Sequence, residues 1–91
     1  MNQIVSYRLR ILGNVQKVGY RNWMREAAIE AGITGWVKNC PDSTVEALIE
    51  GNEDAINRIV ESCGKGPAFA AVKSVVKQKV DFEGCRNFII K

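Results

Sequence analysis

The sequence contains no histidine, and this absence excludes several kinds of catalytic site at once. A serine–histidine–aspartate triad, a cysteine–histidine dyad and a zinc site built on imidazole all need that residue. Cysteine is scarce too: Cys40, Cys63 and Cys85 are widely and irregularly spaced, and an odd number does not indicate a disulfide framework. We therefore expect reduced thiols and a cytoplasmic protein.

Long hydrophobic runs are also missing. No segment approaches the roughly 20 apolar residues that cross a bilayer, and residues 1–8 lack the apolar core of a signal peptide. The net charge of +3 favours anionic ligands only mildly, without the strongly basic composition of a protein that binds nucleic acid or membranes. The 91 residues suffice for one domain and not for two, so we expect a single domain over residues 1–91.

Hydrophobic periodicity predicts alternating strands and helices. Alternating apolar residues predict strands at 5–11 and 44–50, and we expect further strands at 34–39, 72–80 and 87–90. One-sided apolar patterns predict two helices, the first with an apolar face from Trp23 to Ala31 and an end at Gly32, the second from an Asn52 N-cap to Gly64. The order β-α-β-β-α-β, with a short last strand, predicts a ferredoxin-like split β-α-β fold of the α+β class. We expect both helices on one face of an antiparallel sheet.

The segment Gly13-Asn14-Val15-Gln16-Lys17-Val18-Gly19-Tyr20-Arg21 joins the first strand to the first helix. A turn there leaves successive backbone N–H groups unpaired, and the helix N-terminus adds partial positive charge. Arginine at a helix start is unfavourable unless an anion is present, and its guanidinium is a planar fork of donors. The segment therefore predicts a phosphate-sized anion site formed by Val15, Gln16, Lys17, Val18, Gly19, Tyr20 and Arg21.

A second segment, Gly35-Trp36-Val37-Lys38-Asn39, closes the second strand before a turn centred on Pro41-Asp42. Asparagine in this place is more often a simple strand-end residue. The topology of a split β-α-β unit does not by itself bring Asn39 close to Arg21.

The two segments together resemble the acylphosphatases. The resemblance extends from Gly13–Arg21 to Val72 and so covers nearly the whole chain; it includes Gly32, Gly35-Trp36-Val37, Asn39, Asp42, Val45-Glu46, Gly51 and Gly66-Pro67. It implies hydrolysis of carboxyl-phosphate mixed anhydrides to a carboxylate and inorganic phosphate, with neither metal nor cofactor. It also implies one site in which Arg21 binds the phosphate and Asn39 positions the attacking water.

The chemistry of such a substrate is compatible with a site that lacks histidine. The leaving group is a carboxylate, with a pKa of about 4, and it departs without a general acid. Charge on the phosphoryl oxygens can be met by fixed donors, and the phosphate itself can accept the proton of the water. From the resemblance we expect a small-molecule acyl phosphate as substrate and a monomer without nucleic-acid or membrane partners.

One departure from the family pattern leaves a second interpretation open. Lys17 stands where the family usually has glycine. A positive φ there would strain the loop by roughly 1 kcal/mol, whereas the ammonium group could instead add a cation beside the phosphate. The alternative is a non-catalytic phosphate-binding module in which Lys17 impairs catalysis. An RNA-binding domain of this fold is disfavoured because residues 44–50 contain no aromatic and carry Glu46 and Glu50.

Overall fold

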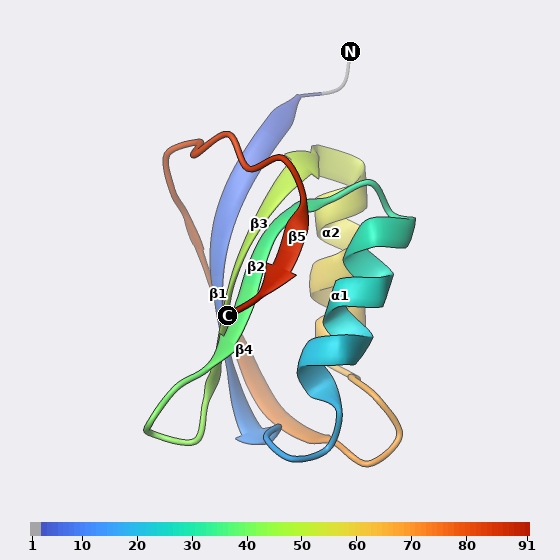
Figure 1. Cartoon of the computed structure of the whole chain (residues 1–91), viewed down its shortest axis with the longest axis vertical. Helices are drawn as coiled ribbons and strands as arrows, with labels where there is room; N and C mark the ends of the chain where they lie inside the picture. Colours follow the sequence, from blue (N-terminus) through green and yellow to red (C-terminus); the bar gives the residue numbers. More distant parts are fainter. Residues whose placement is uncertain (1–2) are drawn as a thin grey trace.

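The computed structural model describes residues 3–91, so the predicted domain of residues 1–91 includes two residues, Met1 and Asn2, that lie outside it. The described residues form five strands and two helices (Figure 1). In chain order these are β1 (Ile4–Asn14), α1 (Tyr20–Glu30), β2 (Thr34–Asn39), β3 (Val45–Asn52), α2 (Glu53–Cys63), β4 (Ala71–Lys79) and β5 (Phe88–Ile90). The predicted element order and the ferredoxin-like fold are confirmed.

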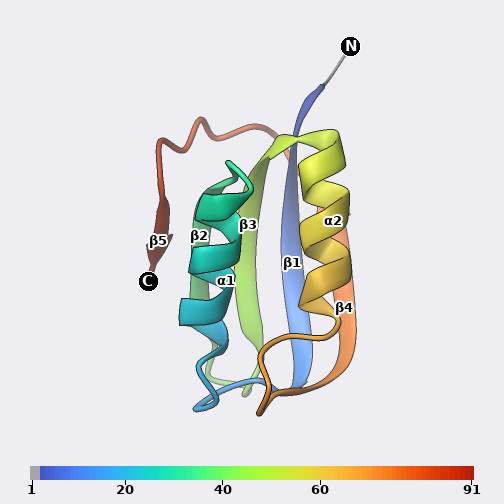
Figure 2. The same ribbon diagram turned by 90° about the vertical axis from the view of Figure 1, so that its right-hand side faces the viewer.

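The strands form one sheet in the order β4-β1-β3-β2-β5, and both helices cover the same face of it (Figure 2). The prediction of an antiparallel sheet is right for β4, β1, β3 and β2 and wrong for β5, which pairs parallel to β2. The cause is the connection formed by residues 80–87. It crosses the end of the sheet from the β4 edge to the β2 edge and reverses the chain direction, so that β5 runs alongside β2.

The core lies between the helices and the sheet. Met24 and Ala28 of α1 and Ile56 and Ile59 of α2 are buried against apolar side chains of the strands, among them Leu9. Burying an aliphatic side chain of this size contributes roughly 1.5–3 kcal/mol, so these apolar faces hold both helices on the sheet.

The helix boundaries follow local backbone chemistry. The side chain of Asn52 accepts a hydrogen bond from the N–H of Asp54 at 2.9 Å, which confirms the predicted N-cap of α2. Gly32 has the predicted left-handed conformation, with a φ of 72°. The prediction that Ala31 belongs to the buried face of α1 is wrong: α1 ends at Glu30, and Ala31 is exposed.

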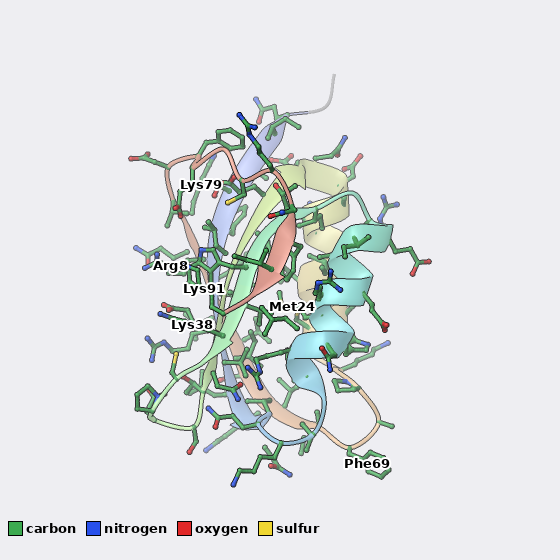
Figure 3. All side chains as sticks on the ribbon, viewed as in Figure 1. Arg8, Met24, Lys38, Phe69, Lys79 and Lys91 are labelled. Atoms are coloured by element: carbon green, nitrogen blue, oxygen red, sulfur yellow. The ribbon has the colours of Figure 1, made fainter. Side chains whose placement is uncertain are left out.

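Arg8, Lys38 and Lys91 lie on the sheet face opposite the helices (Figure 3). The three side chains surround the ring of Trp36. The charged ends of Arg8, Lys38 and Lys91 lie 5.8, 5.4 and 4.4 Å from the centre of the indole ring, and Trp36 is 8% exposed. A ring covered in this way offers no free face on which a nucleic-acid base could stack.

Neither helix of the described residues is long and apolar enough to span a membrane.

Candidate active site

The loop that carries the predicted anion site begins where β1 leaves the sheet. The pairing of β1 with β4 shifts register between Leu12 and Gly13. Gly13 has a φ of 126°, and a Cβ atom there would lie 2.2 Å from the carbonyl oxygen of Ala71. Only glycine fits this close approach of two backbones, so Gly13 fixes the point from which the chain turns toward α1.

Gln16 ties this loop to the hairpin between β2 and β3. Its side-chain nitrogen donates to the carbonyl oxygens of Cys40 and Thr44, at 2.8 and 2.9 Å. These two residues flank the turn centred on Pro41-Asp42, whose Ser43 N–H bonds back to the Cys40 carbonyl oxygen at 3.2 Å. Because Cys40 directly follows Asn39, the Gln16 amide holds the end of β2 beside the loop.

A pocket of about 140 Å³ opens between the loop, the start of α1 and the ends of β2 and β5. We call it the Arg21 pocket. Its lining residues are Val15, Lys17, Gly19, Tyr20, Arg21, Asn22, Asn39 and Ile90. Arg21 and Asn39, which topology alone leaves apart, therefore lie on one pocket.

Two residues of the predicted anion site do not line the pocket, and two others were missed. The Gln16 side chain is directed to the hairpin instead, and Val18 packs against the core. Asn22 lies directly after Arg21, so its position in the first turn of α1 was a usable signal. The sequence contained no signal for Ile90, because only the parallel pairing of β5 with β2 places this residue at the pocket.

The electrostatics of the pocket favour an anion. Arg21 and Lys17 line it, and no carboxylate does. The N-cap of α1, Gly19, has no side-chain cap, and the first turn of α1 contains no acidic residue. Within residues 3–91, the N–H groups of residues 16–19 donate to no protein acceptor. Free N–H groups, an uncapped helix start and two cations together suit an oxyanion.

Asn39 contributes an unusual acceptor. Its side-chain oxygen is buried and has no hydrogen-bond partner among the described residues. A buried polar atom without a partner costs about 1–3 kcal/mol. A residue that lines the pocket thus carries an unsatisfied acceptor.

Lys17 has the positive φ that the sequence left undecided. Its φ of 62° is in the left-handed region, where a side chain with a Cβ costs about 1–2 kcal/mol. The side chain is exposed at the pocket. Both expected effects of lysine are therefore present together: a strained backbone and a cation at the site.

Tyr20 fixes the start of α1 rather than offering its hydroxyl to the pocket. The hydroxyl donates to the carbonyl oxygen of Cys63 at 2.7 Å, and burial raises the pKa of Tyr20 well above its usual range. A Cβ atom on Gly66 would lie 2.8 Å from the Tyr20 ring, so glycine there allows the loop after α2 to pack on it. The next residue, Arg21, is thereby held in a defined place.

No group of three or more His, Cys, Asp or Glu side chains suited to a metal ion occurs in the part of the chain that the structure describes.

The fold and the pocket together define a small ferredoxin-like protein with a pocket suited to an oxyanion. Known proteins share the fold. The family model "Acylphosphatase" matches residues 7–90. An acylphosphatase of Rhizobium etli is 45% identical over 86 residues, which cover 93% of this chain and 92% of that protein. The acylphosphatase structure from Bacillus subtilis is 34% identical with a TM-score of 0.93, and the match covers 98% of this chain and 99% of that one.

A further acylphosphatase structure, from Coxiella burnetii, is 32% identical with a TM-score of 0.94 and covers 97% of this chain and 93% of that one. This chain belongs to the acylphosphatase family. The predicted class of enzyme, a hydrolase of small-molecule acyl phosphates, is therefore confirmed.

Proposed function

We propose that the Arg21 pocket is the site where this chain hydrolyses acyl phosphates, with Arg21 binding the phosphoryl group and Asn39 positioning the attacking water. One observation carries the proposal: Arg21 and Asn39 line the same small pocket, and the amide oxygen of Asn39 is buried without a hydrogen-bond partner among the described residues. Membership of the acylphosphatase family supports it.

The phosphoryl group lies against the loop in this mechanism. The N–H groups of residues 15–20 and the guanidinium of Arg21 donate to its non-bridging oxygens. These donors are fixed before the substrate arrives, so they stabilise the charge that develops during transfer without reorganising. A planar guanidinium can meet two phosphate oxygens at once, which a lysine ammonium cannot do with the same geometry.

Asn39 accepts a hydrogen bond from the water and directs its oxygen at the phosphorus. As the new P–O bond forms, the bond from phosphorus to the acyl oxygen breaks and the carboxylate departs with the bonding electrons. Its conjugate acid has a pKa of about 4, so the carboxylate leaves unprotonated. The proton of the water passes to a phosphate oxygen, and the products are a carboxylate and inorganic phosphate.

We infer the finer features of the enzyme from the same pocket. The proposed mechanism uses residues of this chain alone, and we propose that the enzyme acts as a monomer. The proposed donors are backbone N–H groups and protein side chains, so the mechanism needs neither metal nor cofactor. The three free cysteines are consistent with a cytoplasmic protein.

The alternative, a phosphate-binding module without catalysis, is supported by the strained backbone at Lys17. A distorted loop could bind phosphate and still misplace it relative to Asn39, since small misplacements of reacting groups cost large factors in rate.

The decisive experiment is steady-state hydrolysis of benzoyl phosphate with a chelator present and Arg21→Ala as the control. Turnover by the wild type that vanishes in the variant supports the enzyme. A folded wild type that binds inorganic phosphate without turnover supports the alternative, and restored activity in Lys17→Gly would establish it.

A further inference from the structure

A buried carboxylate on β3 holds the connection between β4 and β5. Glu50 is 1% exposed and lies on the sheet face opposite the helices. Its oxygens accept hydrogen bonds from the N–H groups of Gly84 and Cys85, at 3.1 and 3.0 Å, and from the N–H of Glu83. The hydroxyl of Ser6 also donates, at 2.9 Å. All of these donors converge on one side chain.

The arrangement resembles an anion-binding site in which the Glu50 carboxylate of the same chain takes the place of the anion. Successive N–H groups around a left-handed residue form a concavity that suits a negative charge, and Gly84 has a φ of 77°. Burial by itself raises the pKa of Glu50, but the hydrogen bonds from Glu83, Cys85 and Ser6 outweigh it and hold the pKa below its usual range. Glu50 is therefore ionised at neutral pH, as this concavity requires.

The connection formed by residues 80–87 has few other anchors. Most of its residues are exposed, and it crosses the end of the sheet (Figure 2). At its start the N–H of Val80 bonds to the Ser6 carbonyl oxygen, and at its end the carbonyl oxygen of Asn87 accepts from Gly35 at 2.9 Å. Between these ends, Glu50 is the side chain that fixes its path, and β5 follows directly.

The short strand β5 completes the Arg21 pocket. Ile90 pairs with Val37 of β2 and lines the pocket on the side of Asn39. The other apolar lining side chains, Val15 and Tyr20, are each 1% exposed, whereas Ile90 is partly exposed. Since the loop and Arg21 supply the donors for phosphate, Ile90 is the apolar surface available to the rest of the substrate.

We propose that Ile90 contacts the acyl group of the substrate and that Glu50 is a positioning residue, which acts through residues 80–87 and β5 to hold Ile90 in place. The proposal rests on the proposed function of the pocket and adds its acyl-binding side. It predicts a preference for acyl phosphates with an apolar acyl group, because such a group removes Ile90 from water on binding.

The first test compares two substrates on Ile90→Ala. We expect KM for benzoyl phosphate to rise about 5- to 10-fold, the size expected for a partly exposed apolar contact, while KM for acetyl phosphate changes less than about 2-fold. The inhibition constant of inorganic phosphate should not change, since phosphate contacts the loop and Arg21 but not Ile90. Equal effects on both substrates would overturn the role of Ile90.

The second test asks whether Glu50 acts through Ile90. Glu50→Gln presents amide hydrogens to the loop N–H groups and should raise KM for benzoyl phosphate as Ile90→Ala does, again without changing phosphate inhibition. The double variant should be no worse than the stronger single variant, because both changes remove one contact. Assays are run well below the melting temperature of each variant.

Glu46→Gln is the matched control, because Glu46 lies on the same strand and face but forms ion pairs with Arg8 and Lys38 instead of bonds to residues 80–87. It should leave the KM values unchanged. A Glu50→Gln variant that melts earlier but keeps the KM for benzoyl phosphate would show a merely structural role and overturn the positioning proposal. A double variant in which the two increases in KM for benzoyl phosphate are additive would also overturn the positioning proposal.

If Glu50→Gln does not fold, Gly84→Ala weakens the same contact from the loop. A Cβ atom there meets only the Phe82 ring, at 3.7 Å, but the positive φ disfavours alanine. The same KM pattern is expected, and its absence overturns the positioning role. Failure of the proposed function is distinguishable from all of these results, because the wild type itself would then not turn over benzoyl phosphate.

Discussion

The side-chain nitrogen of Gln16 lies 2.8 Å from the carbonyl oxygen of Cys40, the residue that follows Asn39. This hydrogen bond joins two segments that are far apart along the chain and adjacent at one end of the sheet. Together with the bond to Thr44, it sets the separation between the loop that carries Arg21 and the strand end that carries Asn39.

Gln16→Ala should therefore reduce both stability and activity. Two hydrogen bonds of about 0.5–1.5 kcal/mol each are lost, so we expect the free energy of unfolding to fall by about 1–3 kcal/mol. Movement of Asn39 relative to the loop should lower kcat/KM about 10-fold or more. Urea unfolding and steady-state kinetics measure the two effects. Gln78→Ala on the exposed edge strand β4 is the control and should change neither; a fully active Gln16→Ala would contradict this role.

Arg21→Ala should abolish both turnover and inhibition by inorganic phosphate. Arg21→Lys should restore little, because a point charge cannot replace a planar pair of donors. Isothermal titration with phosphate and kinetics with benzoyl phosphate give the two readouts. Arg25→Ala, one turn further along α1 and outside the pocket, should behave as the wild type. Substantial activity in Arg21→Lys would mean that charge alone suffices.

Asn39→Ala should separate activity from stability. Loss of one oriented polar group should lower kcat by about 10²–10³-fold, with little change in phosphate inhibition. Because the Asn39 oxygen is buried without a protein partner, its removal should leave the melting temperature unchanged or raise it. An active Asn39→Ala enzyme would disprove the water-positioning role.

Substitutions at Lys17 can separate backbone strain from charge. Lys17→Gly removes the cost of holding a side chain in the left-handed region, about 1–2 kcal/mol. It also raises the conformational entropy of the unfolded chain, which stabilises that state by about 0.4–1 kcal/mol. The free energy of unfolding should therefore rise by less than about 1.5 kcal/mol. Lys17→Met keeps the strain and removes the ammonium. If the ammonium contributes to binding, phosphate inhibition weakens in both variants; if strain limits the rate, only the glycine variant gains kcat.

Glu50 should give stability that is lost in acid. Its pKa is lowered in the folded protein, so its contribution is present above the pKa of the unfolded chain and disappears as the pH falls through the lower folded value. We expect the melting temperature of the wild type to decrease once the pH drops under about 4.5. Glu50→Gln should be less stable at pH 7, and the gap should narrow toward pH 3. Parallel melting curves across that range would contradict this expectation.

The parts of the fold with local sequence signals were predictable. Alternation in β1, the Asn52 cap and Gly32 at the end of α1 each depend on neighbouring residues, and the structure has them as expected. The parallel pairing of β5 was not predictable in this way. It depends on hydrogen bonds that the N–H groups of residues 83–85 donate to Glu50, which lies more than thirty positions earlier in the chain, and a buried glutamate has no distinctive pattern in the sequence.

The candidate site likewise has a part that the sequence predicts locally and a part that depends on long-range contacts. The loop around Arg21 is a continuous segment, and its residue types predict an anion site. The positions of Asn39 and Ile90 depend on long-range pairing, which only the family resemblance supplied for Asn39 and nothing supplied for Ile90. Gln16 shows how such a contact is made: the sequence indicated that its amide is structural, and the structure identifies the acceptors.

The place of β5 has a practical consequence for anyone who prepares this protein. The strand runs toward the end of the sheet where the Arg21 pocket opens, and the following residue, Lys91, bonds through its N–H to Val37 (Figure 1). An affinity tag fused there would emerge beside the pocket and pull on Ile90. The start of β1 lies at the opposite end of the sheet, where the N–H of Glu53 at the start of α2 bonds to the carbonyl oxygen of Gln3. Purification and surface immobilisation should therefore use the amino-terminal side.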